Sequence, residues 1–598
     1  MTATPRTLNE LLFQALDRFG SRPVVMRAKR GGLWVDLSYR DLADRVQDLS
    51  LGLLELGVRP GDRVAILSEN RPEWAIADYA CLTACCTDVP IYPTLPAKQV
   101  EHNLSDSGSV AAFVSTRTQL DKLLSIRERL PRLLHIIGFD AGSSENGVLS
   151  LEDVYARGRA ARGKHGSWRE DAVRVQPDDL ATLIYTSGTT GQMKGVMLTH
   201  SNITSNVTTS CKLFSFRDDD ECLSFLPLSH IFERMFGHYC MMHAGVIINY
   251  AESVDTVASD MASVRPTLMA SVPRLYEKIY GRVLDAVRAG SAIKKQIFFW
   301  GKRVGEAVVD RRMANRSVPA MLALQFKLAD KLVFEKLRAR TGGRIRFFIS
   351  GGAPLSADIA RFFHAAGMPV LEGYGLTETS PVIAVNTFQH QRLGTVGLPI
   401  PGVEVKIAPD GEILTRGPHV MPGYFEKPEA TAEALDTEGW FHTGDIGALD
   451  ADGFLKITDR KKDIIVTAGG KNIAPQPIES LAKTNKFVSS AVMLGDRRPF
   501  PVMLIVPNFD NLSAWAAKEG IPAADPAALV TRPEVQKKME EEIRTTLKEL
   551  AGFERPKKLL LLSRDFTIES GELTPKMSIK RKVVEQRHSA AIEALYRE

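Results

Sequence analysis

Cysteine is scarce in this sequence, and the few cysteines do not lie where a metal or a disulfide would need them. The 598 residues include six cysteines, and none has a zinc-like paired spacing with histidines. A large intracellular chain needs no disulfides, so we expect small buried thiols. Disulfide-stapled scaffolds and structural zinc modules are therefore excluded. The six residues are Cys81, Cys85, Cys86, Cys211, Cys222 and Cys240.

Long apolar runs and a large excess of charge are also absent. No stretch approaches about eighteen uninterrupted apolar residues, so we expect no membrane-spanning helix. The N-terminal segment MTATPRTLNELLFQALDRFG contains acidic residues and no continuous apolar run, which is typical of a capped amphipathic helix and not of a secretory signal. The net charge is only +5, which does not favour nucleic acid as a partner. A cytoplasmic protein is the expectation.

The composition is that of an ordinary globular protein, long enough for about two to four domains. Hydrophobic residues make up 44% of the chain and charged residues 25%. Over the first three quarters, short apolar segments alternate with amphipathic ones, which predicts α/β layers with mainly parallel sheets. The strand candidates are DRVAILS (62–68), VAAFVS (110–115), LATLIYT (180–186), GVIINY (245–250), TLMASV (267–272) and RIRFFIS (344–350).

The sequence pattern changes from about Gly394. VEVKIAPDGEILTRG and DGFLKITDR show period-two patterning and Asp-Gly turns, which indicates a small antiparallel, barrel-like β-part. The later strand candidates SSAVMLG, PVMLIVP and KKLLLLS belong to a smaller α+β portion. We therefore expect a large multi-layer N-terminal domain (1–458), a boundary at 459–464 and a small C-terminal domain (465–598).

Residues 281–340 differ from the rest of the N-terminal part. They carry fourteen Lys or Arg against five Asp or Glu, arranged around apolar positions, which predicts a helical insertion with a basic face. Two interpretations stay open: a solvated helix pair packed on the core, or a peripheral contact with an anionic membrane. The apolar positions include Ile297, Phe298, Trp300, Leu322, Phe326 and Leu332.

The segment YTSGTTGQMKGVMLTHSN, Tyr185–Asn202, predicts a phosphate-binding loop. It follows an apolar strand candidate and runs into SNITSN, which is typical of a helix start. Gly188, Gly191 and Gly195 let backbone N–H groups approach a ligand closely. Neighbouring hydroxyls and Lys194 add donors and a positive charge. The Walker pattern is excluded, because no Gly-Lys-Ser/Thr follows at the required spacing.

Four further segments accompany this loop. They are SGGAPLS (350–356), a glycine-rich turn; LEGYGLTETSP (371–381), with Tyr374, Thr377 and Glu378 after a strand; GWFHTGDIG (439–447), with Asp445 on a tight turn; and TDRKKDIIVTAGGKNIAP (458–475). Taken together and in this order, the five segments resemble those of the adenylate-forming superfamily, and the resemblance covers nearly the whole chain. Within that superfamily the chain looks most like the long-chain fatty acid–CoA ligases, because of FLPLSHIFER, the basic insertion and ELTPKMSIKRK.

The resemblance implies both an activity and a moving part. The activity is ATP-dependent activation of a long-chain fatty acid, through an acyl-adenylate, to acyl-CoA, with release of AMP and pyrophosphate. ATP, Mg²⁺ and coenzyme A would take part. The C-terminal domain would be mobile and would rotate about a hinge at Asp459 between the two half-reactions. Gly469 and Gly470 would line the channel for the pantetheine arm of coenzyme A.

The same resemblance implies roles for single residues. Glu378 would bind Mg²⁺, and Thr377 would reach the α-phosphate. Asp445 would accept hydrogen bonds from both ribose hydroxyls, with Arg460 beside it. His230 would gate the acyl site, or it is a core histidine with satisfied hydrogen bonds. The residues expected around ATP are Thr186, Ser187, Gly188, Thr189, Thr190, Gly191, Lys194, Gly351, Gly352, Ala353, Pro354, Tyr374, Gly375, Thr377, Asp445 and Arg460.

One motif departs from the family pattern. Long-chain ligases carry a segment resembling Leu-Thr-Pro-Thr-x-Lys-x-Lys-Arg, whose first lysine bridges the substrate carboxylate and the α-phosphate. Here the segment reads LTPKMSIKR, with Ser578 at that position. Lys576 and Lys580 lie two residues to either side, and on an extended segment they project to the same side. Either could supply the missing charge. We favour Lys576, because the family has threonine there, which suggests a lysine–serine exchange.

Two other functions stay open beside the CoA ligase. A fatty acyl-AMP ligase that loads a carrier protein shares the first half-reaction. The altered lysine segment also leaves room for a catalytically weakened acyl or nucleotide sensor. The expected partners are a long-chain fatty acid, ATP and CoA, with no nucleic acid. For the oligomeric state, a monomer and a homodimer are both open.

Overall fold

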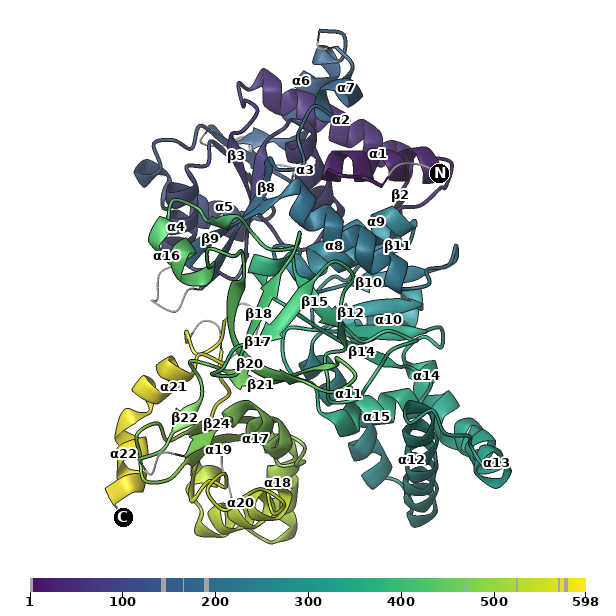
Figure 1. The fold of residues 1–598 in the computed structure, drawn as a ribbon, viewed down its shortest axis with the longest axis vertical. Coiled ribbons are helices and arrows are strands. Elements are labelled where there is room, and N and C mark those ends of the chain that lie inside the picture. Colours follow the sequence, from purple (N-terminus) through teal and green to yellow (C-terminus); the bar gives the residue numbers. More distant parts are fainter. Residues whose placement is uncertain are drawn as a thin grey trace.

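The computed structural model describes most of the chain. Its large N-terminal part carries two extended sheets and a small antiparallel sheet, and a separate lobe holds the C-terminal residues (Figure 1). The described residues are 4–140, 147–164, 166–187, 193–468, 471–522, 525–567, 570–574 and 579–597.

The first large sheet is mainly parallel. Every pairing from its third strand to its eighth is parallel, and only its first two pairings, β19 with β9 and β9 with β8, are antiparallel. In spatial order its described strands are β19 (Gly423–Tyr424), β9 (Met193–Thr199), β8 (Leu180–Ser187), β4 (Thr87–Ile91), β3 (Arg63–Leu67), β5 (Ala111–Val114), β6 (His135–Gly138) and β7 (Leu149–Ser150).

The second large sheet is parallel at its centre. Its five central pairings are parallel, and antiparallel strands close it at both edges. In spatial order its described strands are β16 (Leu398–Pro399), β15 (Val382–Val385), β14 (Val370–Gly375), β13 (Phe347–Ser350), β12 (Leu268–Ser271), β10 (Glu221–Ser224), β11 (Ile247–Tyr250), β1 (Met26–Arg30) and β2 (Leu33–Leu37).

The two large sheets share one hydrophobic core. Every residue of α3 (Pro72–Thr83) is buried, and its side chains join one cluster with α8 (His200–Leu213) and with strands of both sheets. A helix that is apolar all round is stable only when it is covered on all sides. The two sheets therefore form one structural unit and cannot be separate domains.

Helices cover the outer faces of these sheets. The predicted N-terminal amphipathic helix is confirmed as α1 (Leu8–Phe19), which Thr7 and Glu10 close with a capping box. The other helices here are α2 (Tyr39–Glu55), α4 (Ala97–Ser107), α5 (Arg117–Leu124), η1 (Arg127–Arg129), α6 (Leu151–Ala161), α7 (Trp168–Ala172), η3 (Glu233–Cys240), α9 (Met241–Ala244), α10 (Val257–Val264), α15 (Ala357–Ala365), η5 (Thr377–Thr379) and α16 (Pro428–Ala434).

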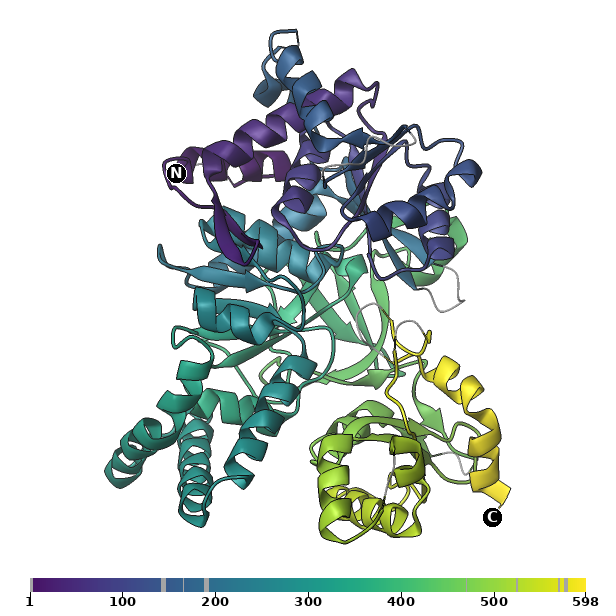
Figure 2. The same cartoon turned by 180° about the vertical axis from the view of Figure 1, so that it is seen from behind.

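The basic insertion is helical, as the sequence predicts. Its helices project away from the sheets in both views (Figures 1 and 2). Their inner faces form a second cluster with α15, β13 and β14. The helices are α11 (Pro273–Arg288), α12 (Ala292–Met313), α13 (Ala320–Ala329), η4 (Asp330–Phe334) and α14 (Glu335–Arg340).

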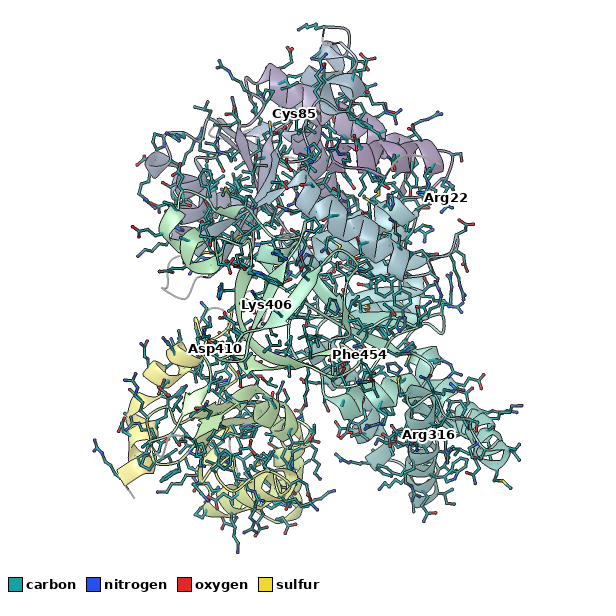
Figure 3. The ribbon with its side chains drawn as sticks, viewed as in Figure 1. Arg22, Cys85, Arg316, Lys406, Asp410 and Phe454 are labelled. Carbon is teal, nitrogen blue, oxygen red and sulfur yellow. The ribbon has the colours of Figure 1, made fainter. Side chains whose placement is uncertain are left out.

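The predicted barrel-like part corresponds to a small antiparallel sheet. Its described strands are, in order, β17 (Glu404–Ile407), β18 (Glu412–Arg416), β20 (Phe441–Leu449) and β21 (Leu455–Arg460). The Asp-Gly turn at 410–411 joins the first two strands, as the sequence predicts. Figure 3 labels Lys406, Asp410 and Phe454 in this region, between the two large sheets and the C-terminal lobe.

The C-terminal lobe has a mixed sheet of its own, with α-helices around it. The three predicted strands are confirmed, and two clusters of apolar side chains fill the lobe. The elements are β22 (Ile465–Val466), β23 (Asn472–Ile473), α17 (Pro475–Ala482), β24 (Val488–Leu494), β25 (Val502–Pro507), α18 (Phe509–Lys518), α19 (Pro526–Val530), α20 (Pro533–Thr546), β26 (Lys558–Leu561), α21 (Arg581–Arg587) and α22 (Ser589–Arg597).

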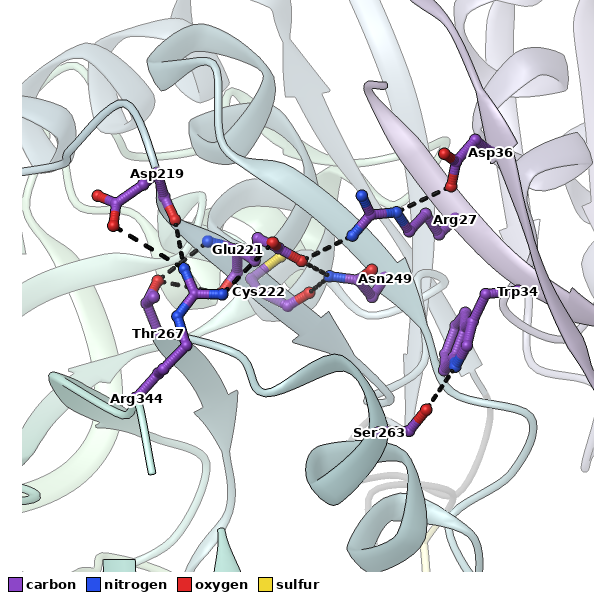
Figure 4. A network of polar contacts seen from close by, with 10 residues as sticks. All are labelled: Arg27, Trp34, Asp36, Asp219, Glu221, Cys222, Asn249, Ser263, Thr267 and Arg344. Atoms are coloured by element: carbon purple, nitrogen blue, oxygen red, sulfur yellow. Dashed lines mark hydrogen bonds and ion pairs between the residues drawn. The ribbon is translucent and has the colours of Figure 1, made fainter. Parts of the chain in front are cut away.

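A polar network stabilises the amino ends of the central strands of the second sheet (Figure 4). Glu221, at the start of β10, accepts from Arg27 Nη1 at 2.9 Å and from Asn249 Nδ2 at 3.3 Å, and Arg344 Nη1 lies 3.6 Å from it. Arg27 also donates to Asp36 of β2 at 2.8 Å. These ion pairs and hydrogen bonds connect neighbouring strands at their amino ends, opposite the edge at which their carboxyl ends lie.

The helix start predicted at SNITSN is confirmed: α8 begins at His200 and is capped by Thr199, and the unpredicted strand β9 lies between it and the loop and pairs antiparallel with β8. Two other local predictions were wrong. Asp445 lies inside β20 and not on a tight turn. Tyr374 lies within β14 and not after it. In each case the pairing of neighbouring strands extends β-structure into residues that look like a loop in the sequence.

The remaining absences agree with the sequence. None of the helices in the described part of the chain combines the length and the apolar character needed to cross a bilayer. The six cysteines form no disulfide; four are buried, and Cys85 and Cys211 are half-buried. Cys85, labelled in Figure 3, and Cys211 therefore differ from the expected buried thiols.

Candidate active site

The candidate site begins where parallel strands of the second sheet end. Gly351–Pro354 follow β13, and η5 follows β14, so both turns leave the same edge of the sheet. In open α/β sheets, ligands bind at the carboxyl ends of the strands. The residues of these two turns that we expect to bind ATP therefore lie at one edge of the sheet.

The hairpin of β8 and β9 carries the predicted phosphate loop at its tip. Thr186 pairs with Lys194, and Ser187 with Met193. Near this tip the hairpin is anchored at Tyr185, which pairs with Gly195 and whose hydroxyl donates to Asp106 Oδ2 at 2.7 Å. The predicted residues Gly188, Thr189, Thr190 and Gly191 lie outside the described part of the chain.

Three segments far apart in the sequence meet at Glu378. The Tyr424 hydroxyl donates to Glu378 Oε1 at 3.0 Å, and Lys194 Nζ lies 5.1 Å from the centre of the Tyr424 ring. β19 pairs with β9, which brings Tyr424 opposite Val196. A predicted phosphate-loop lysine and the predicted Mg²⁺ ligand therefore lie on either side of one tyrosine.

A second group forms around Asp445. The Tyr374 hydroxyl donates to Asp445 Oδ2 at 2.7 Å, and Arg460 Nε lies 3.5 Å from Oδ1. Asp445 is 7% exposed. Burial raises the pKa of Asp445, the nearby Arg460 charge and the Tyr374 hydrogen bond oppose that rise, and the negative charge of Glu378 adds to it. Tyr374 lies in β14 and Glu378 in η5, which follows that strand, so the Asp445 group and Glu378 both lie at the carboxyl end of β14.

Glycine is required at one of the predicted positions. A Cβ on Gly375 would lie 1.7 Å from the carbonyl oxygen of Pro381. The pairing of β14 with β15 shifts register at this point, so the backbones approach too closely for any side chain. Gly375 therefore serves to hold Tyr374 and η5 in place.

The acyl-gate candidate lies next to the glycine-rich turn. A Cβ on Gly351 would lie 3.3 Å from the Phe232 ring, and the backbone N–H of Phe232 donates to His230 Nδ1 at 3.0 Å. This hydrogen bond makes Nδ1 an acceptor and leaves the proton of the neutral ring on Nε2. His230 is half-buried, and both interpretations of it, an acyl gate and a core histidine with satisfied hydrogen bonds, stay predictions.

Asp459 connects the small sheet to the C-terminal lobe. Its carboxylate accepts from the backbone N–H groups of Arg460 at 2.6 Å and of Gln476 at 3.4 Å. Asp459 is 1% exposed, and burial raises its pKa to about 6. The backbone groups it joins lie on β21 and at the start of α17, on either side of the predicted hinge.

Of the two predicted lysines, the structure describes only Lys580. Lys580 lies just before α21 in the C-terminal lobe, where its N–H donates to Glu572 O at 2.8 Å, and no contact in the described part of the chain joins it to Asp445 or Glu378. Lys576 and Ser578 lie outside the described residues, as do Gly469 and Gly470.

Sequence reasoning missed two features of this region. One is Tyr424, whose signal was the Gly-Tyr pair in MPGYFEK. The other is Arg234, four residues after His230, whose fully buried guanidinium pairs with Asp78 and Asp88. Arg234 Nη1 also donates to Thr182 of β8 at 2.9 Å. It therefore connects the segment after His230 to the strand that leads into the phosphate loop.

Comparison with known proteins agrees with this arrangement. The family model described as "AMP-binding enzyme" matches residues 12–425, and the model for its C-terminal domain matches residues 462–598. The chain therefore belongs to the AMP-binding enzyme family, whose members form acyl-adenylates.

Within that family the chain is similar to named CoA ligases. It is 38% identical over 570 residues to a long-chain-fatty-acid–CoA ligase of Mycobacterium bovis, covering 94% of this chain and 93% of that protein. It is 36% identical over 593 residues to the peroxisomal long chain acyl-CoA synthetase 7 of Arabidopsis thaliana, covering 94% and 82%.

A solved structure shares the fold. The adenylation domain of a carboxylate reductase from Mycobacterium chelonae superposes with a TM-score of 0.78 at 23% identity, covering 99% of this chain and 91% of that one. This likeness confirms the α/β architecture with a smaller C-terminal domain.

Proposed function

We propose that this protein activates long-chain fatty acids in two steps, first forming an acyl-adenylate from ATP and then an acyl-CoA thioester. The observation that carries the proposal is that Lys194 and Glu378 meet at Tyr424, while Tyr374, on the strand that leads to Glu378, donates to Asp445. Family membership supports ATP, Mg²⁺ and CoA as the other participants.

The residues around Asp445 fit a nucleoside. Each carboxylate oxygen of Asp445 faces one protein donor, Tyr374 or Arg460, and a carboxylate offers about four acceptor sites. Acceptor sites are therefore left for both ribose hydroxyls. The exposed backbone of Gly352–Pro354 and the Tyr374 ring would frame the adenine.

The residues around Glu378 fit Mg²⁺. A carboxylate oxygen is a preferred ligand of this hard cation, which takes its other ligands from water and phosphate. Tyr424 engages Oε1, and no contact in the described part of the chain engages Oε2. The bound cation would offset the phosphate charge, while Lys194 and the loop hydroxyls would hold the β- and γ-phosphates.

Adenylation brings two anions together. A carboxylate oxygen of the fatty acid forms a bond to the α-phosphorus, the bond from that phosphorus to the bridging oxygen breaks, and pyrophosphate leaves. Positioning and charge neutralisation lower such a barrier most. We assign this role to Thr377, at the α-phosphate, and to Lys576 or Lys580, between the phosphate and the carboxylate. His230 would gate the acyl chain.

Thioester formation needs a second arrangement of the C-terminal domain. The CoA sulfur bonds to the acyl carbon as AMP leaves, and the thiol must reach a site that the domain covered during adenylation. We propose that the domain turns about Asp459, whose hydrogen bonds join β21 to α17. Gly469 and Gly470 would line the pantetheine channel.

The proposal also covers location and assembly. We propose a cytoplasmic protein that contacts a membrane surface peripherally through residues 281–340, because that segment is basic and projects from the molecule. A homodimer stays a prediction.

Product analysis tests the proposed function. The purified protein would be incubated with ATP, Mg²⁺ and saturated fatty acids of rising length, with CoA or a phosphopantetheinyl carrier protein as acceptor. We expect fatty-acid-dependent pyrophosphate release, fastest for long chains, and transfer to CoA. Transfer to the carrier alone would make the protein a carrier-loading ligase. Nucleotide binding without pyrophosphate release from any acid would make it a sensor.

A further inference from the structure

One face of the projecting helices carries an exposed apolar stripe. Met321, Leu324, Leu328 and Leu332, which we call the α13 stripe, follow one another at spacings of three, four and four residues along α13 and η4, and they are 67%, 64%, 52% and 38% exposed. Residues at such spacings share one side of a helix. The stripe is therefore a continuous outer face.

The opposite face of α13 already has its partner. Leu322, Phe326 and Ala329 pack into the second core cluster with α12 and α15. The stripe thus contributes nothing to the packing of the hairpin of α12 and α13. On α12, Ile293 and Phe299 are also exposed. Of the fifteen large apolar side chains exposed among the described residues, six fall within residues 293–332.

Basic side chains flank this stripe. Lys327 and Lys331 lie along its edge, are exposed, and form no ion pair in the described part of the chain. Arg316, labelled in Figure 3, extends the positive charge to the turn between α12 and α13. Two acidic residues lie nearby: Asp330, which is held in an ion pair with Arg338, and Glu335.

We infer that the α13 stripe docks on the surface of an anionic lipid bilayer. An amphipathic helix with apolar and basic side chains on its outer face lies in the interface plane, with the apolar side chains among the headgroups and the lysines near lipid phosphates. This inference rests on the proposed membrane contact, and it identifies the face and the lipid charge that make it. It does not depend on the assignment of the nucleotide residues.

Charge argues against a second copy as the occupant. A two-fold dimer through the stripe would bring the same patch of both copies together, so Lys327 and Lys331 of each copy would place four positive charges at one interface. Like charges placed opposite each other oppose association. An anionic bilayer instead offers a complementary charge and an apolar interior to the same face.

Vesicle flotation tests the inference. The full-length protein would be mixed with phosphatidylcholine vesicles, with and without phosphatidylglycerol, at salt concentrations from about 0.05 M to about 0.5 M. We expect binding to the phosphatidylglycerol vesicles that weakens with salt. Leu324→Asp/Leu328→Asp should reduce binding about tenfold or more, and Lys327→Gln/Lys331→Gln by about tenfold. The matched controls Leu134→Asp, at another exposed leucine, and Lys518→Gln/Lys537→Gln should bind as the unmutated protein does.

Other results of these experiments would overturn the inference. Equal binding by the stripe variants and the unmutated protein would overturn the inference, as would no binding to either vesicle. A dimer that the stripe variants make monomeric, with no change in flotation, would assign the face to a second copy. Pyrophosphate release with a fatty acid kept below its micellar concentration should be unchanged in all variants. If the unmutated protein releases pyrophosphate normally but binds neither vesicle, this inference fails and the proposed function stands.

Discussion

Replacing Asp445 with asparagine tests the nucleoside site, because it removes a charge and almost no volume. The carboxylate faces Tyr374 at 2.7 Å and Arg460 at 3.5 Å, and we assign its other acceptor sites to the two ribose hydroxyls. A hydrogen bond to a charged acceptor exceeds one to a neutral acceptor by about 1 kcal/mol. Two hydroxyls then give about 2 kcal/mol, which is about 30-fold in kcat/KM for ATP.

The assay is pyrophosphate release at saturating fatty acid, with ATP and 2′-deoxy-ATP as alternative substrates. The unmutated protein should lose about tenfold in kcat/KM with 2′-deoxy-ATP, and Asp445→Asn only about threefold, because the hydroxyl and the carboxylate act as a pair. Glu404→Gln removes an exposed carboxylate from the same small sheet, and it should leave kcat/KM unchanged.

The reasoning fails if the two losses are independent. An equal penalty for 2′-deoxy-ATP in the unmutated protein and in Asp445→Asn would mean that Asp445 does not meet the 2′-hydroxyl. A fall of less than about threefold with ATP itself would remove Asp445 from the site. A matching melting temperature would show that the variant is folded.

Four further predictions concern the cation, the hinge, the pH dependence of stability and the lysines. Glu378→Ala should lower adenylation at least about a hundredfold at saturating Mg²⁺ and leave the melting temperature unchanged; near-normal pyrophosphate release would contradict its role. Asp459→Pro should spare acyl-AMP formation and slow CoA transfer, since proline restricts rotation, whereas equal losses in both steps would exclude a pivot. Burial raises the pKa of Asp459 to about 6. Between about pH 4 and 6 the folded protein therefore keeps a proton on Asp459 that the unfolded chain has lost, so stability falls as pH rises through that window. Asp459→Asn should raise the melting temperature more at pH 8 than at pH 4. Lys576→Ala should slow adenylation by two or more orders of magnitude, about 3 kcal/mol, and spare transfer from preformed acyl-AMP; normal adenylation in both Lys576→Ala and Lys580→Ala would place the catalytic lysine elsewhere.

The sequence predicts the strands well where apolar runs are bounded by polar turns. RIRFFIS and TLMASV became β13 and β12 because buried parallel strands are continuously apolar. The hairpin of β17 and β18 followed from alternation around an Asp-Gly turn. These signals are local, so a single sequence contains them.

Features that depend on distant pairing could not be predicted. β9 contains a lysine and a glycine at the end of a loop, and only its neighbours β8 and β19 make it a strand. Tyr424 reaches Glu378 through that same pairing. Arg234 reads as a surface residue in the sequence, yet two aspartates from α3 and β4 allow its complete burial.

Isotope transfer from the fatty acid to AMP tests the central claim most directly. Palmitate labelled with ¹⁸O in its carboxylate would be incubated with the protein, ATP, Mg²⁺ and CoA, and the nucleotide and thioester products analysed by mass spectrometry. An acyl-adenylate route transfers one labelled oxygen to AMP, because the oxygen that bonds to the α-phosphorus leaves with it when the thioester forms. We therefore predict AMP that carries one ¹⁸O, with palmitoyl-CoA in equal amount. Label in inorganic phosphate with ADP as the nucleotide product, or AMP without label, would contradict the account.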